Sequence, residues 1–139
     1  MNLQTLIWIS GILHLGTLLG SAQVPKELKF AEELPKLNRL LRHWVLVASG
    51  YIVLNLVAFG VLSLAFAEEL ASGSSLARGV CGFVSVFWGI RLVIQLLLFD
   101  AREYLRNWFL TIGYHGLTVV FAWHTAIYGY AAIWPWLKS

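Results

Sequence analysis

The stretch 43–67, HWVLVASGYIVLNLVAFGVLSLAFA, contains no Asp, Glu, Lys or Arg. A helix rises about 1.5 Å per residue, so about 20 apolar residues cross the ~30 Å hydrocarbon core of a bilayer. The stretch is therefore long enough for a transmembrane helix. Runs of similar length and character lie on either side of it. We predict four membrane spans, at about residues 3–24, 43–67, 79–99 and 107–134.

The composition excludes an ordinary soluble protein. Only 12% of the 139 residues are charged and 59% are hydrophobic, whereas a soluble domain is about 25% charged. The length suits one domain, and short connections between helices favour antiparallel neighbours. We therefore predict an all-α integral membrane protein, with residues 1–139 forming a single domain folded as an up-down-up-down bundle of four transmembrane helices.

The charged residues lie between the predicted spans and indicate topology. The loop between spans two and three carries Glu68 and Glu69 with only Arg78, whereas the other two loops are richer in Lys and Arg, at Lys26, Lys29, Lys36, Arg39, Arg42, Arg102 and Arg106. Basic loops remain cytoplasmic. We expect both termini on the non-cytoplasmic side, in a bacterial inner (cytoplasmic) membrane. Because the net charge of +3 comes from these loops, we expect contact with the lipid bilayer and no nucleic-acid partner.

Four ionisable side chains fall inside the predicted spans: His14, Arg91, His115 and His124. Such groups cost several kcal/mol in hydrocarbon, so each should face a partner, a cofactor or a water-filled cavity. By helical rise, His14 lies ~15 Å, and His115 and Arg91 each ~12 Å, from the inner boundary of the membrane. These three side chains can therefore share one layer of the bundle.

The faces of the helices separate the two histidines of the last span. His115 belongs to a stripe of small and polar residues that includes Thr111 and Thr118, which should turn inward. His124 is nine residues further on, about half a turn around the helix, and shares its face with Phe121. We predict that His115 points into the bundle and that His124 points toward lipid or another membrane subunit.

Two neutral imidazoles at one depth, on facing helices, are the axial ligands of a b-type haem. We predict that His14 and His115 ligate the haem iron and that Arg91 pairs with a propionate. Flanking glycines would leave room for the porphyrin, namely Gly11, Gly16, Gly113 and Gly116. The single cysteine, Cys81, excludes a Cys-x-x-Cys-His attachment site, so the haem would be non-covalent. A quinone is the other cofactor that this interior suggests.

These features favour an electron-transfer subunit of a redox or energy-converting membrane complex, with haem b exchanging electrons with quinone. Familiar catalytic motifs are absent from the sequence, so a self-contained enzyme is the weaker interpretation and an enzymatic role stays uncertain. Alternatively, His14 is a packing residue that shares its proton with Thr17 or a backbone carbonyl, and the protein is a cofactor-free accessory subunit of a larger membrane complex. A third interpretation is a small transporter in which His14 takes up a proton.

Overall fold

The computed structural model describes residues 2–21, 24–27, 29–97 and 108–138. Within these residues, four helices are long and apolar enough to cross a membrane. They are α1 (Leu3–Ser21), α4 (Arg39–Ala65), α6 (Ser75–Leu97) and α7 (Trp108–Leu137). This confirms the prediction of an all-α integral membrane protein with four transmembrane helices. Arg102 and Arg106 of the predicted third loop lie outside the described residues. So do the ends of the neighbouring predicted spans, at 98–99 and 107.

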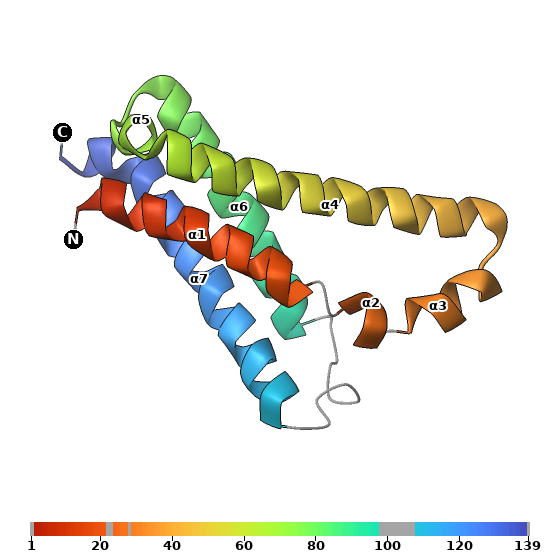
Figure 1. The fold of residues 1–139 in the computed structure, drawn as a ribbon. Helices are drawn as coiled ribbons and strands as arrows, with labels where there is room; N and C mark the ends of the chain where they lie inside the picture. The colour runs from red at the N-terminus through yellow and green to blue at the C-terminus, as the bar shows by residue number, and fades with distance from the viewer. Residues whose placement is uncertain (1, 22–23, 28, 98–107, 139) are drawn as a thin grey trace.

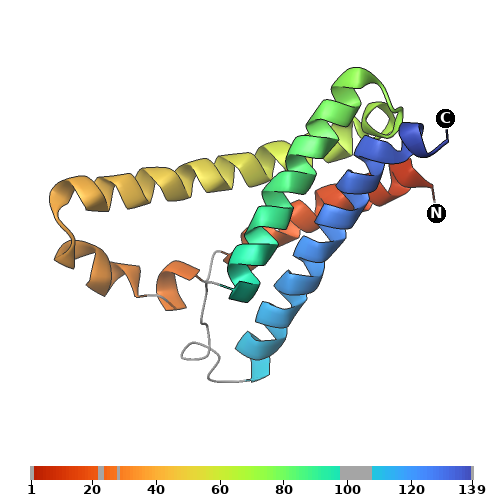
Figure 2. The same ribbon diagram turned by 180° about the vertical axis from the view of Figure 1, so that it is seen from behind.

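The helices run alternately up and down (Figures 1 and 2). Three short elements lead from α1 to α4: α2 (Val24–Glu27), α3 (Phe30–Glu33) and the 3-10 helix η1 (Leu34–Lys36). At the opposite end of the bundle, α5 (Ala67–Ala71) connects α4 to α6. Both ends of the chain lie on the α5 side (Figure 1), as an even number of spans requires.

Local sequence explains where the long helices begin and turn. Asn38 precedes α4, and its side-chain oxygen accepts a hydrogen bond from the backbone N–H of Leu41 at 2.8 Å. This is the usual bond of an N-cap asparagine. The turn into α6 contains Gly73 with φ 78°, and a β-carbon there would come within 2.8 Å of the Pro135 side chain in the last turn of α7. Both the backbone angle and the close approach therefore require glycine.

The transmembrane helices pack as two pairs, α1 with α4 and α6 with α7, and the pairs meet where α1 contacts α7. Gly11 and Gly60 bring α1 and α4 together, since a β-carbon on Gly11 would lie 3.0 Å from the Gly60 carbonyl oxygen. In the other pair, a β-carbon on Gly129 would lie 3.0 Å from the Ser85 hydroxyl oxygen. Small residues let helix backbones approach closely in membranes.

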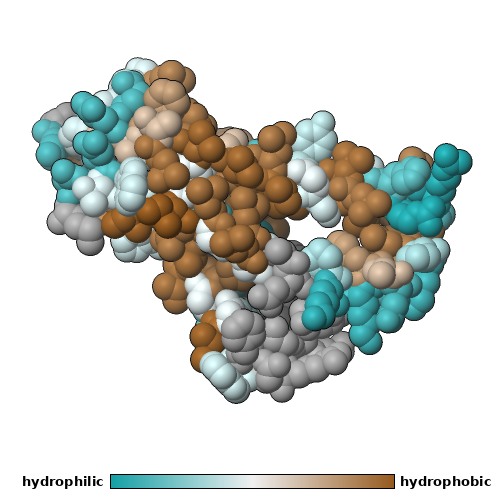
Figure 3. Space-filling model, in the orientation of Figure 1, coloured by the Kyte–Doolittle hydropathy of each residue, from teal (hydrophilic) through white to brown (hydrophobic). Residues whose placement is uncertain are grey.

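The two halves of α4 differ in their packing. The inner half, 56–65, contains the buried residues Leu56, Phe59, Gly60 and Ser63. In the outer half, Arg39–Asn55, no residue is buried, and both views show this half extending away from α6 and α7 (Figures 1 and 2). Hydrophobic residues cover the middle of the molecular face in Figure 3, with hydrophilic residues gathered toward its ends, as a bilayer would require.

Candidate functional site

His14 lies at the centre of the bundle with both ring nitrogens in hydrogen bonds. Its side chain is fully buried. Nδ1 lies 2.7 Å from the carbonyl oxygen of Ser10 one turn earlier, and Nε2 lies 2.8 Å from the indole Nε1 of Trp88 on α6. A carbonyl only accepts and an indole N–H only donates. These partners therefore assign the proton to Nδ1 and leave His14 a neutral residue that bonds α1 to α6.

His124 of α7 stacks directly on His14. The ring centroids are 4.0 Å apart at an interplanar angle of 27°, and the Trp88 ring lies 5.0 Å from His124. His124 is fully buried, yet neither of its ring nitrogens has a hydrogen-bond partner among the described residues. We call His14, Trp88 and His124 the histidine cluster.

Aromatic rings and hydroxyl groups enclose the histidine cluster. Phe121 stacks on Trp88 with ring centroids 4.9 Å apart, and the Phe59 ring meets His14 edge-on. One turn beyond His124, the Tyr128 hydroxyl hydrogen-bonds the Ser63 hydroxyl of α4. All four long helices thus contribute side chains to this centre, which is a packed core and not a channel.

The predicted orientations of the two α7 histidines are wrong. His124 is fully buried, so it cannot present a surface to lipid or to another subunit, and His115 is exposed. The stripe that contains His115 lies on the flank of α7 that meets α6, where Thr118 accepts a hydrogen bond from Gln95 and the Ser85 hydroxyl donates to the Thr125 carbonyl oxygen. These small polar residues join two helices and do not line a central cavity.

Of the four glycines predicted to leave room for a porphyrin, one packs against α4 and three lie on the surface. Gly11 is buried against α4, where an added β-carbon would lie 2.9 Å from Leu64. Gly16, Gly113 and Gly116 are exposed, and an added β-carbon at any of them would meet nothing within 4 Å. They are therefore not placed around a ligand of His14.

Arg91 lies beside the histidine cluster and not in it. Its guanidinium carbon is 5.4 Å from the centroid of the Phe121 ring, and Phe121 in turn stacks on Trp88. Arg91 is thus held against an aromatic face, a favourable position for a cation of this kind. The contact is to a neighbouring ring of the protein, so the predicted pairing with a haem propionate stays a prediction.

A haem held by His14 and His115 does not fit these residues. An axial ligand needs a free ring nitrogen that points at the iron, and both nitrogens of His14 already bond to Ser10 and Trp88. His115 is exposed and makes a ring contact with its neighbour Tyr114. Among the described residues, no group of three or more His, Cys, Asp or Glu side chains is arranged to hold a metal ion.

Sequence reasoning missed the pairing of His14 with His124, although a signal for it was present. The buried residues Phe121, His124, Tyr128 and Ala131 recur every three or four positions along α7, which marks one continuous helix face. Aromatic residues at this spacing, with a histidine among them, indicate the packed face as well as small residues do.

Comparisons of the chain with family models, with curated proteins and with solved structures gave no match.

Proposed function

We propose that this protein is a structural subunit of a larger membrane complex, in which the outer half of α4 packs against a membrane-spanning helix of another subunit. The observation that carries the proposal is Asn55. It lies ten residues before Ala65, or about 15 Å along the helix, and is therefore deep in the span. Its side chain is exposed and has no hydrogen bond within the described part of the chain.

An amide exposed at this depth would face hydrocarbon in an isolated molecule. Burying an unbonded amide in an apolar medium costs several kcal/mol, and interhelical hydrogen bonds from Asn are a recurring contact between membrane helices. Tyr51 lies one turn away on the same face and is 63% exposed. A second helix with a polar group at mid-depth would satisfy Asn55 and cover Tyr51 together.

The bonding of His14 supports the same proposal. Both of its nitrogens serve contacts inside the bundle, which is the packing role that the sequence left open. The buried polar groups in Ser63 and Tyr128 likewise bond to each other across α4 and α7. His14 and these hydroxyl groups thus stabilise the fold, and the exposed amide of Asn55 is left for a contact outside the bundle, as an accessory subunit needs.

The test compares Asn55→Leu with the matched variant Asn55→Gln, which keeps the amide. Each chain is extracted from its native membrane in a mild detergent, and the mass and composition of the complex that contains it are measured. We expect the wild type and Asn55→Gln to remain in a complex with at least one different membrane polypeptide, and Asn55→Leu to migrate alone. An unchanged complex with Asn55→Leu, or one that contains only copies of this chain, would contradict the proposal.

A second candidate, an electron-transfer subunit that binds haem b or a quinone, is favoured by the two buried nitrogens of His124, for which the described part of the chain offers no partner. An optical spectrum of the purified protein, oxidised and then reduced with dithionite, tests the haem, and quinone extraction tests the other cofactor. A reduced α-band, or a retained quinone, that is lost in His124→Phe would favour this candidate over the structural one. A colourless, quinone-free sample from cells with ample haem would eliminate it.

A further inference from the structure

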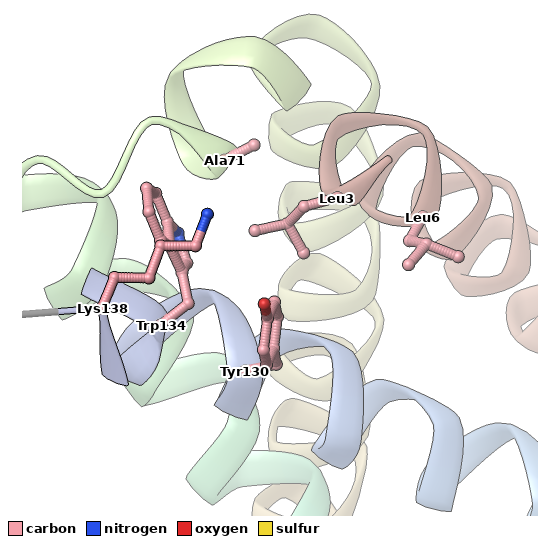
Figure 4. Close-up of a pocket in the computed structure, with 6 residues that line it drawn as sticks. All are labelled: Leu3, Leu6, Ala71, Tyr130, Trp134 and Lys138. Atoms are coloured by element: carbon pink, nitrogen blue, oxygen red, sulfur yellow. The ribbon is translucent and has the colours of Figure 1, made fainter. Parts of the chain in front are cut away.

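The end of the bundle that holds Leu3 and Lys138 contains a pocket with a volume of about 310 Å³. Small-molecule sites in proteins begin at about this size. The pocket lies between α1, α5 and α7 (Figure 4) and is lined by Leu3, Leu6, Ala71, Tyr130, Trp134 and Lys138. None of these residues belongs to the histidine cluster or to the outer half of α4.

One side of the pocket offers hydrogen-bond donors. Figure 4 shows the side chains of Lys138, Trp134 and Tyr130 on the α7 side of the pocket, with the Lys138 ammonium extending toward Leu3. The Lys138 nitrogen lies 5.0 Å from the centroid of the Trp134 ring. The indole Nε1 of Trp134 is buried and has no acceptor among the described residues. A buried N–H without an acceptor is costly, so the site lacks an acceptor that a ligand can supply.

The opposite side of the pocket is apolar. It consists of Leu3, Leu6 and the methyl group of Ala71 (Figure 4). Cationic, aromatic and apolar groups at the end of a membrane span are the setting in which proteins bind lipid head groups.

We propose that this pocket binds one anionic amphiphile. Its phosphate or carboxylate oxygens accept hydrogen bonds from Lys138 and Trp134, and the start of its hydrocarbon chain lies on Leu3 and Leu6. A charged acceptor matches an ammonium and an N–H donor, and a zwitterionic lipid would bring a second, unwanted cation close to Lys138. The proposal does not depend on how α4 is partnered.

The test uses the full chain, purified and stripped of lipid in detergent, and native mass spectrometry to count bound molecules. Four probes are titrated separately: phosphatidylglycerol, oleate, phosphatidylcholine and inorganic phosphate. The pocket variants are Lys138→Gln and Trp134→Phe, of which the second keeps the aromatic ring and removes the N–H. The matched controls are Lys36→Gln and Trp136→Phe, whose residues do not line the pocket. Circular dichroism checks that each variant remains folded.

We expect one saturable molecule of phosphatidylglycerol or oleate per chain, and the tighter of the two identifies the head group as phosphate or carboxylate. Each pocket variant should bind it about tenfold more weakly, the effect of losing one hydrogen bond to a charged group, and the controls should match the wild type. Equal affinity for phosphatidylcholine, full affinity in both pocket variants, or equally tight binding of inorganic phosphate would each overturn the proposal.

Discussion

The inner and outer halves of α4 belong to one apolar helix, although the outer half begins with Arg39, Arg42 and His43, and their surroundings are opposite. The inner half packs against α1, with Gly60 and Ser63 buried, whereas no residue of the outer half is buried. In water, such an exposed apolar surface would be unstable. In a membrane it is not, because lipid tails are as apolar as leucine, so the hydropathy of a helix face does not show whether that face contacts lipid or protein. The packed surfaces of this protein are therefore distinguished by close contacts and polar groups rather than by hydrophobicity.

The largest expected effect comes from a large buried side chain at the centre of the bundle. Trp88 is almost fully buried, contacts the rings of Phe121 and His124, and donates its N–H to His14. Trp88→Ala should lower the free energy of unfolding by about 3 kcal/mol, the lower end for such truncations, because lipid removes part of the hydrophobic term. The measurement is unfolding by SDS titration in bicelles, followed by circular dichroism.

The control is Trp44→Ala in the outer half of α4, where the ring is 68% exposed. It should change the free energy of unfolding by less than about 0.5 kcal/mol. Equal losses of unfolding free energy in the two variants would mean that the outer half of α4 is packed as tightly as the centre of the bundle, which would contradict the difference between the two halves.

Two glycines of α4 give a smaller and better matched contrast. At Gly60 an added β-carbon would lie 3.0 Å from the Leu15 side chain, whereas at Gly50 it would meet nothing within 4 Å. Gly60→Leu should therefore destabilise the bundle by about 1–3 kcal/mol through overpacking. Gly50→Leu should leave stability unchanged or raise it slightly, because leucine favours the helix. The same SDS titration measures both variants. Destabilisation by Gly50→Leu alone would show that the outer half of α4, and not the inner half, is the closely packed one.

The smallest expected effect concerns the histidine cluster itself. His124→Phe keeps a ring stacked on His14 and Trp88 and removes two nitrogens that have no partner among the described residues. Its free energy of unfolding should stay the same or rise by about 1 kcal/mol, since an unsatisfied buried group is destabilising. His115→Phe, at an exposed position, should change it by less than about 0.5 kcal/mol. A marked loss of stability in His124→Phe would show that these nitrogens bind a ligand or water.

The number and order of the spans could be predicted because each depends on local composition and charge, whereas α4 and α6 each begin four residues before the predicted spans, at Arg39 and Ser75. The sides of α7 that contact each neighbouring helix could not be predicted. The rule that small polar residues turn inward correctly marks a helix contact, but it does not say which neighbour is contacted. The stripe through Thr118 and Thr125 meets α6, while the aromatic face with His124 meets both α1 and α6. Choosing between these neighbours requires the relative rotation of whole helices, which no local pattern contains.

The divergence of the outer half of α4 was likewise invisible in the sequence. Residues 44–54 of the outer half are mostly apolar, as the inner half is, and the burial of Leu56 against the exposure of Leu54 reflects which helices lie nearby. In the sequence, Asn55 is simply one polar residue of an apolar span. Its significance emerges from its position, exposed and unbonded just where packing stops.

Photo-crosslinking in the native membrane shows whether the outer half of α4 contacts another protein or only lipid. Benzoylphenylalanine is placed in the chain in place of Tyr51, or in place of Val119 on α7, which is 67% exposed. We expect an adduct of one defined membrane polypeptide from position 51, absent when Asn55→Leu is also present, and only lipid adducts from position 119. Lipid adducts alone from position 51 would contradict this expectation.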